Sequence, residues 1–277
     1  MGSKMRDISF IILTWNSKKF LDDCFGSIVS KCQSEGIDFE IIVVDNGSTD
    51  GSEAIFGKFQ KENPGRFRSV LLGKNTGTTY PRNIGMREAN GRNICILDSD
   101  TELGEGSLMD ALSRLDRDDS IGLLVPRLLL PDQSVQNSVK RFPTFWQKLS
   151  KIPKAVFGVQ VPNLDFYSEF PFTEETDVDT AISACWLFRR ELTDQVGYLD
   201  EKIFYSPEDL DYSVRVRKAK KRILFYPGFT VLHHTQQISH KKPFSKVSLS
   251  HFGGLLYYYR KHGGWFSAKG LYRQTGA

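Results

Sequence analysis

Two carboxylates, Asp98 and Asp100, stand one residue apart directly after an apolar run at residues 94–97. A buried parallel strand ends in this way, so both side chains would leave the sheet at its carboxyl edge. Hard divalent cations take oxygen ligands, and Mg²⁺ or Mn²⁺ complexes of a diphosphate are usually held by one or two carboxylates. The spacing therefore predicts a metal and diphosphate site at Asp98, Ser99 and Asp100. The alternative is a turn in which an aspartate caps the next helix.

Asp45 follows a second apolar run, at residues 39–44. A carboxylate at a strand end can accept hydrogen bonds from the ribose or the base of a nucleotide. The residues that follow, 46–50, could equally form a well-capped turn. The two interpretations are compatible, with Asp45 on a ligand and Asp50 on the next helix.

A third acidic cluster, formed by Glu208, Asp209 and Asp211, opens a predicted helix after Pro207. Acidic side chains in the first turn of a helix interact favourably with its dipole, and that alone would explain them. Transfer of a group to a hydroxyl, however, needs a general base within hydrogen-bond reach of the attacking oxygen. A carboxylate of this cluster is a candidate for that base.

Two adjacent histidines, His233 and His234, follow a predicted strand at 223–226 and Pro227. A neutral imidazole could complete the coordination shell of the metal. A pair of histidines after a strand is more often structural, and both interpretations stay open at this point.

These candidates are positioned by a repeating pattern of strands and helices. Apolar runs predict strands at 8–13, 39–44, 69–72 and 94–97, with helices near 20–28, 52–62 and 80–90 between them. Such alternation indicates right-handed crossovers and an α/β fold with a mostly parallel sheet, in which ligands lie beyond the carboxyl ends of the strands. Those ends carry Thr14-Trp15-Asn16, Asp45-Asn46, Gly73-Lys74-Asn75 and Asp98-Ser99-Asp100.

The middle of the chain, residues 127–180, is broken by prolines and rich in aromatic residues. A stretch of this kind is typical of a loop-rich lid or acceptor-binding region. We therefore predict a nucleotide-binding half at 5–126 and an acceptor-binding and catalytic half at 127–240, both within one domain. A basic aromatic extension follows at 241–277.

The bulk composition excludes several classes of protein. The 277 residues are 40% hydrophobic, enough for a sizeable core, but no stretch reaches the ~18–20 apolar residues of a membrane span. The first apolar run, at 8–13, has only strand length and lacks the flanks of a secretory signal. Four scattered cysteines predict free, buried thiols and neither a disulfide framework nor a zinc site. We expect a cytoplasmic protein.

Charge is distributed unevenly along the chain. Residues 212–277 carry 13 Lys or Arg and no acidic residue, whereas residues 1–211 carry 24 basic and 33 acidic residues, a net of −9. A block of one sign usually indicates an anionic partner. The aromatic and basic segment near residues 255–273 could lie peripherally on the cytoplasmic face of a membrane and meet a lipid-linked diphosphate. Alternatively it packs on the domain, and no motif supports nucleic-acid binding.

Taken in order, these motifs resemble family 2 of the inverting glycosyltransferases, which have the GT-A fold. The resemblance spans about residues 8–240, and its later part is similar to the subgroup of bacterial rhamnosyltransferases. It rests on the segment Phe10-Ile11-Ile12-Leu13-Thr14-Trp15-Asn16, the segment Val43-Val44-Asp45-Asn46-Gly47-Ser48-Thr49-Asp50-Gly51, Asn75 with Gly77, Arg82-Asn83 with Gly85, Leu97-Asp98-Ser99-Asp100, the segment Val196-Gly197-Tyr198-Leu199-Asp200-Glu201 with Phe204, and Glu208-Asp209-Leu210-Asp211 with Arg215.

The resemblance implies a metal-dependent hexosyltransferase that uses a UDP- or dTDP-sugar and Mn²⁺ or Mg²⁺ to build a bacterial cell-surface glycan. Asp209 would be the general base and Glu208 its neighbour or substitute, while Asp98, Asp100 and His233 would hold the metal. The acceptor would be a glycan or a lipid-linked diphosphate, and a homodimer is compatible with the sequence. The nucleotide sugar would contact Thr14, Asn16, Asp45, Asn75, Arg82, Asp98 and Ser99.

Two departures from the subgroup concern the sugar. The usual small residues after Asn75-x-Gly77 are replaced by Thr78-Thr79-Tyr80-Pro81, and the metal motif is Asp-Ser-Asp where Asn-Pro-Asp is frequent. The sugar therefore stays open. The rival functions are a nucleotidyltransferase, which would carry a Gly-rich basic loop after the first strand, and a catalytically inactive module that binds sugar nucleotides.

Overall fold

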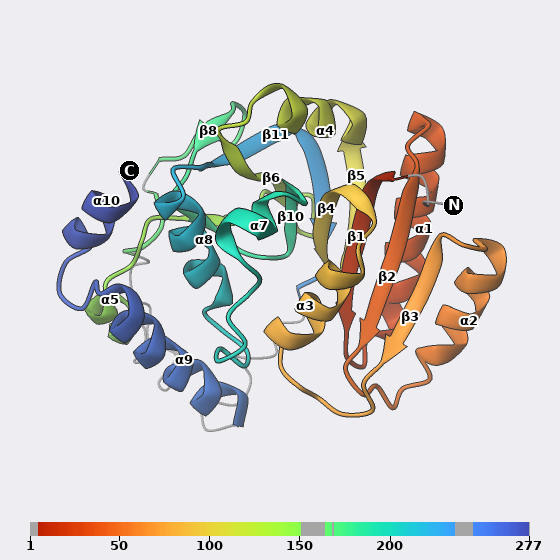
Figure 1. The fold of residues 1–277 in the computed structure, drawn as a ribbon, viewed down its shortest axis with the longest axis horizontal. Coiled ribbons are helices and arrows are strands. Elements are labelled where there is room, and N and C mark those ends of the chain that lie inside the picture. The colour runs from red at the N-terminus through yellow and green to blue at the C-terminus, as the bar shows by residue number, and fades with distance from the viewer. Residues whose placement is uncertain (1–4, 151–163, 168, 236–245, 277) are drawn as a thin grey trace.

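One large sheet runs through the protein, and helices cover both of its faces (Figure 1). The computed structural model describes residues 5–150, 164–167, 169–235 and 246–276. Within them the strand order of the sheet is β3-β2-β1-β4-β10-β6-β11-β5, and β8 pairs with β11 beside this path.

The first four strands along the chain are parallel neighbours, because each is an apolar run buried between two helical layers. They are β1 (Arg6–Thr14), β2 (Phe39–Asp45), β3 (Phe67–Leu71) and β4 (Gly91–Asp98). In the register of the sheet, Thr14 lies opposite Asp45, and Leu13 lies opposite Asp98. The carboxyl ends of these strands therefore meet at one edge, as the sequence predicts.

The rest of the sheet is mixed, so the parallel arrangement is confined to the nucleotide-binding half. Its strands are β5 (Thr101–Gly106), β6 (Ile121–Leu129), β8 (Thr176–Asp177), β10 (Cys185–Arg189) and β11 (Arg222–His233). Strand β10 pairs antiparallel with both β4 and β6, whereas β6 and β11 are parallel. The boundary expected at residue 126 falls inside β6, so one continuous sheet joins the two expected halves.

Strand β11 is much longer than the segment predicted at 223–226. Proline lacks the N–H that a strand needs, so Pro227 looks like a terminator in the sequence. In the structure the registers with β6 and β5 shift between Tyr226 and Val231, an irregularity that accommodates the proline. The strand then continues and places His233 opposite Thr101 at the start of β5.

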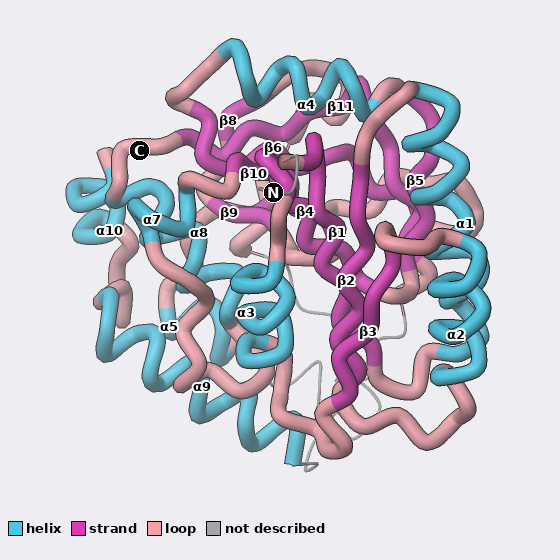
Figure 2. The backbone as a smooth tube through the Cα atoms, turned by 45° about the vertical axis from the view of Figure 1, so that its right-hand side comes forward, coloured by secondary structure: helices cyan, strands magenta, loops and turns pink. Residues whose placement is uncertain are grey.

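Helices pack on the two faces through separate apolar clusters. On one face lie α1 (Lys18–Glu35), α2 (Glu53–Glu62) and α4 (Leu108–Arg117). On the other lie α3 (Thr79–Glu88), α7 (Leu192–Val196) and α8 (Glu208–Lys218). Figure 2 shows the sheet between these two groups. The apolar clusters on both faces fix the strand ends, which carry the site, relative to one another.

The C-terminal helices form an outer layer on α8. The helix α5 (Phe145–Leu149) lies beside α9 (Lys246–His262), and α10 (Lys269–Thr275) follows (Figure 1). A third apolar cluster joins them to α8, with Leu210 and Val214 packed among Leu255, Tyr258 and Tyr259. A small two-stranded sheet of β7 (Val139–Lys140) and β9 (Thr180–Ala181) completes the fold.

Two expectations from composition can be compared with this fold. Cys24, Cys32, Cys95 and Cys185 are all buried and free, as predicted. Among the helices in the described part of the chain, none combines the length and apolar character needed to cross a bilayer.

Candidate active site

The aspartates that follow β4 lie against the end of β11. Asp98, Asp100 and His233 each offer a ligand atom, and these atoms all lie within 4.8 Å of one another. His233 Nε2 is 3.6 Å from Asp100 Oδ1, and its Nδ1 is 2.9 Å from Gln136 Oε1. Two carboxylates and an imidazole oriented by a second polar group form a donor set that suits a divalent cation. The residues present therefore fit the predicted metal.

The neighbouring His234 points to a different partner. Its Nε2 lies 2.5 Å from Glu102 Oε1, and its ring stacks on Phe20 with centroids 5.2 Å apart. Its backbone N–H donates to the carbonyl oxygen of Asp100 at 2.9 Å. His233 is the last residue of β11, and of the two histidines it is the one whose ring lies within 4.8 Å of both aspartates.

A buried arginine connects the metal edge of the sheet with the start of α8. Arg82 Nη2 donates to Asp98 Oδ1 at 2.6 Å, and Nη1 donates to Glu208 Oε1 at 3.0 Å. Ser183 Oγ lies between them, accepting from Arg82 at 2.9 Å and donating to Glu208 at 2.9 Å. Arg82 was predicted to contact the nucleotide sugar. The structure places it between two carboxylates separated by more than a hundred residues in the sequence.

The electrostatics of this network follow from its burial. Burial alone would lower the pKa of Arg82, but Asp98 and Glu208 raise it overall, so the guanidinium keeps its charge. Burial raises the pKa of Glu208 to about 7, and the nearby charge of Asp209 adds to the shift while Arg82 opposes it. Burial also raises the pKa of Asp98 against the opposing effect of Arg82.

Asp209 lies in the first turn of α8, next to Glu208. Its side chain is half-buried, and its Oδ1 accepts from the backbone N–H of Leu210 at 2.8 Å. Glu208 is turned into the network with Arg82, whereas Asp209 keeps contact with solvent. The two adjacent carboxylates therefore occupy different environments, which suits different roles.

The nucleotide end of the predicted site lies at β1 and β2. Asp45 accepts from the N–H groups of Gly47 and Ser48 at 3.2 and 2.9 Å and from Ser48 Oγ at 2.5 Å. Beside it, Thr14 is fully buried, and its Oγ1 has no hydrogen-bond partner among the described residues. With two strand spacings between β2 and β4, Asp45 and Asp98 lie roughly 10 Å apart.

Three further predicted residues hold loops together at this edge. Asn16 Oδ1 accepts from Thr49 N–H at 2.8 Å, which ties the loop after β1 to the loop after β2. Asn75 Oδ1 accepts from Gly77 N–H at 3.0 Å and from Asn46 at 3.2 Å. Ser99 Oγ donates to Ser17 Oγ at 3.0 Å. Each lies at the predicted edge, where Asn16 and Asn75 accept from backbone N–H groups and Ser99 bonds another side chain.

The unusual Thr78-Thr79 segment has a structural task that the sequence did not reveal. Thr78 N–H and Thr79 Oγ1 donate to the carbonyl oxygens of Phe204 and Ile203 at 2.6 and 2.8 Å. At Gly77, with φ of +91°, an added Cβ would lie 2.0 Å from the Phe204 oxygen, so only glycine fits. The segment thus secures the loop that leads to Glu208.

Ser183 and Gln136 are site residues that sequence reasoning missed. Gln136 lies in the irregular region at 127–180 and Ser183 lies just after it, and neither belongs to any of the motifs. No spacing marks them as partners of Glu208 and His233. Only the pairing of β10 and β6 with the rest of the sheet brings them to the carboxylates.

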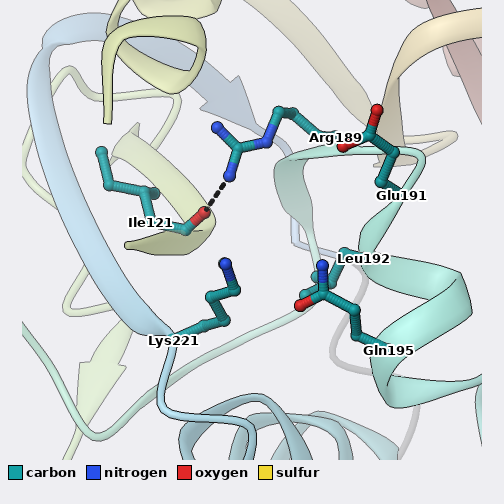
Figure 3. A pocket seen from close by; sticks show the side chains of 7 residues that line it. Ile121, Arg189, Glu191, Leu192, Gln195 and Lys221 are labelled. Atoms are coloured by element: carbon teal, nitrogen blue, oxygen red, sulfur yellow. Dashed lines mark hydrogen bonds between the residues drawn. The ribbon is translucent and has the colours of Figure 1, made fainter. Parts of the chain in front are cut away.

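A small pocket at the opposite edge of the sheet is lined by charged side chains but by none of the predicted site residues (Figure 3). Arg189 ends β10, which runs antiparallel to β4, so this pocket lies away from Asp98. Arg189 and Lys221 are bound to backbone carbonyls of Leu115 and Asp119, at 2.5 and 2.7 Å. Their charges are therefore engaged in holding loops.

Comparison with known proteins identifies the family. The family description "Glycosyl transferase family 2" matches residues 9–197. An N-acetylglucosaminyl-diphospho-decaprenol L-rhamnosyltransferase of Mycobacterium tuberculosis is 28% identical over 244 residues, which cover 82% of this chain and 77% of that protein.

Solved structures show the same fold. The crystal structure of GalNAc-T7 with UDP, GalNAc and Mn²⁺ superposes with a TM-score of 0.70 at 16% identity, covering 93% of this chain and 48% of that one. Residues 1–349 of Staphylococcus aureus TarS with UDP-GlcNAc give a TM-score of 0.57 at 20% identity, covering 85% and 61%. The chain therefore spans about half to three fifths of the length of these two structures, and the likeness is to the GT-A fold.

The buried Glu208 generates a testable pH dependence. Its folded pKa of about 7 exceeds the ordinary value of 4.5, so between these pH values the folded chain holds a proton that the unfolded chain has released. Rising pH across this window therefore lowers the free energy of unfolding. Glu208→Gln removes this loss. We expect its Tm, measured by calorimetry in EDTA, to rise relative to the unsubstituted protein from pH 5 to pH 8.

Glu62→Gln, at an exposed position of α2, provides the control and should show no such trend. A Tm difference for Glu208→Gln that stays constant across this pH range would mean that Glu208 is already ionised in the folded protein.

Proposed function

The chain belongs to glycosyltransferase family 2, and we propose that it is an inverting transferase that moves a hexose from a nucleotide-diphosphate donor to a hydroxyl group. The acceptor we propose is a glycan or lipid-linked intermediate of bacterial cell-surface polysaccharide synthesis. One observation supports this most strongly: the Arg82 bridge joins the Asp98 edge of the sheet to the helix that begins with Glu208 and Asp209. The bridge therefore links the edge that we propose for the donor to the helix that we propose for the base.

The donor is expected along the carboxyl edge of the parallel strands. The nucleoside would lie at β1 and β2, where the buried Thr14 Oγ1 lacks a partner among the described residues and Asp45 ends the strand. The diphosphate would then extend toward Asp98 and Asp100, a span of roughly 10 Å set by two strand spacings. Both the solved GalNAc-T7 and TarS structures hold UDP or a UDP-sugar. A UDP- or dTDP-sugar therefore remains our choice of donor.

The chemistry then follows from the chain's own groups. The acceptor hydroxyl oxygen forms a bond to the anomeric carbon as the bond from that carbon to the diphosphate oxygen breaks, and the configuration inverts. Asp209 accepts the proton of the hydroxyl, which a half-buried carboxylate beside the site can do. A divalent cation bound by Asp98, Asp100 and His233 would supply positive charge near the departing nucleoside diphosphate. Arg82 keeps Asp98 and Glu208 in place throughout.

Two rival functions make different predictions. A nucleotidyltransferase would release pyrophosphate and join the nucleotide to its substrate, whereas the family match supports release of a nucleoside diphosphate. A catalytically inactive binding module would hold a sugar nucleotide without turnover. The separate environments of Glu208 and Asp209 favour an active enzyme, because a binding module needs no half-exposed carboxylate at this place.

Membrane contact is proposed through an aromatic surface formed by Trp146 and Phe266. Their side chains are 54% and 80% exposed, and their ring centroids lie 6.1 Å apart. Exposed Lys269 and Arg273 follow on α10, so cations and aromatic rings share this layer. Other basic residues of the C-terminal region are engaged internally; Arg222, for example, binds Asp118 and Asp177. The excess of basic residues therefore serves both internal ion pairs and this surface, and we assign only the surface to a membrane.

The general base can be tested by donor hydrolysis in the presence of Mn²⁺ and a panel of UDP- and dTDP-sugars. Asp209→Asn should lower the rate at least about 100-fold, because general base catalysis typically contributes 10²–10⁴-fold. Nucleotide affinity, measured by calorimetry, should change little. Asp23→Asn, at an exposed position on α1, is the control. Undiminished turnover in Asp209→Asn would remove this residue from the mechanism.

The metal ligands can be tested by comparing the two adjacent histidines. His233→Ala should weaken Mn²⁺ binding at least about tenfold in a titration followed by electron paramagnetic resonance, because one ligand of the cluster is lost. His234→Ala removes the contact with Glu102 and should leave the Mn²⁺ affinity nearly unchanged. The reverse order of effects would assign the metal to His234 instead.

The membrane surface can be tested by co-sedimentation with vesicles. We expect more protein to bind to vesicles containing phosphatidylglycerol than to pure phosphatidylcholine, and added salt should weaken the binding. The double substitution Trp146→Ser with Phe266→Ser should lower the bound fraction severalfold. Met109→Ser, at an exposed position of α4, should not lower it. Equal binding by the double variant and the unsubstituted protein would refute the assignment.

A further inference from the structure

Helix α9 touches the segment that leads into the proposed base. Gly254 of α9 is buried, and a Cβ added to it would lie 2.1 Å from the carbonyl oxygen of Ser206. Ser206 and Pro207 immediately precede Glu208. The neighbouring Gly253 is exposed, and a Cβ there would meet nothing within 4 Å. One face of α9 therefore lies directly against the backbone before α8.

Asp211 of α8 binds side chains at the C-terminal end of α9. Its carboxylate is fully buried and accepts from Lys261 Nζ at 2.7 Å, His262 Nε2 at 2.8 Å and Arg215 Nε at 2.9 Å. Burial alone would raise the pKa of Asp211, but the hydrogen bond from His262 and the charge of Arg215, with Lys261, hold it well below its usual value. A buried carboxylate with three charged or polar donors fixes both helices to each other.

A second carboxylate extends the same attachment to the preceding loop. Asp200 Oδ2 accepts from Tyr257 Oη at 2.9 Å and from Lys261 Nζ at 2.6 Å. Lys261 therefore binds Asp200 and Asp211 together. On the other side, Thr78 and Thr79 hold the same loop at residues 203–205. The approach to Glu208 is thus held between α3 and α9.

We propose that α9 is a positioning element for catalysis, with Gly254, Lys261 and Asp211 as positioning residues for Asp209. This rests on the proposed function, because it assigns Asp209 the role of base. The family match ends at residue 197, so neither the base nor α9 lies within the matched segment. Asp211 is two residues from Asp209 on the same helical turn, and a displacement of about 1 Å at a catalytic group can reduce a rate 10²-fold.

The most direct test compares alanine at the two neighbouring glycines. Both substitutions increase helix propensity by the same amount, but only Gly254→Ala places a methyl group against the Ser206 carbonyl. We expect Gly254→Ala to lower kcat at least about tenfold while the KM for the donor changes less than twofold. Gly253→Ala should match the unsubstituted protein in both constants.

A second measurement does not depend on turnover. Hydrogen exchange followed by mass spectrometry should show faster exchange at residues 199–211 in Gly254→Ala, with no change at residues 39–52 of the nucleotide end. Lys261→Met, which removes both ion pairs of Lys261, should have the same effect. Arg260→Met, at the exposed position beside it, should not.

The outcomes separate the proposal from the function on which it rests. If the unsubstituted protein turned over no donor while the expected exchange pattern appeared, the transferase function would be rejected but the attachment of α9 would stand. Normal kcat in Gly254→Ala and Lys261→Met would overturn the positioning role, and so would a parallel loss of donor affinity and kcat. Unchanged exchange at residues 199–211 in both variants would overturn the attachment itself.

Discussion

The arrangement of the site depends on the ion pairs that the buried guanidinium of Arg82 forms with two carboxylates. Arg82 binds Asp98 at the end of β4 and Glu208 at the start of α8, so it joins the edge proposed for the donor to the helix proposed for the base. A charge with almost no solvent contact is tolerated only when it is paired and hydrogen-bonded. Asp98, Glu208 and Ser183 together meet that requirement. Removing any one of them would leave buried charge or polar groups without partners.

The fold supplies the remaining constraints in two ways. Parallel strands bring Thr14, Asp45 and Asp98 to one edge, a consequence of chain direction alone. The antiparallel strands then bring the second half of the chain back to that edge. The irregularity in β11 around Pro227 allows the strand to continue to His233, and the pairing with β5 sets this histidine beside Asp100. The donor set therefore combines a local motif with a partner more than 130 residues away.

Much of this arrangement could be predicted from the sequence. The apolar runs and the polar residues at their ends were sufficient for the parallel half and the grouping at one edge, and the resemblance to family 2 supplied the GT-A fold. The choice between His233 and His234 stayed open because it depends on a strand register that Pro227 obscures. Arg82 was expected near the donor, but its long-range partners Glu208 and Ser183 lie more than a hundred residues away. The attachment of α9 to Asp200 and Asp211 carries no sequence pattern, because its contacts join single residues of different elements.

We propose above all that Asp98, Asp100 and His233 hold a divalent cation on the same side of the molecule as Asp209. A crystal structure with Mn²⁺ and UDP, with the ion located by its anomalous scattering, tests this most directly. We expect the anomalous peak to lie among these three side chains, with the diphosphate bound to the ion and the Asp209 carboxylate facing the open end of the diphosphate. A peak beside His234 and Glu102, or a diphosphate bound away from Asp209, would contradict the claim.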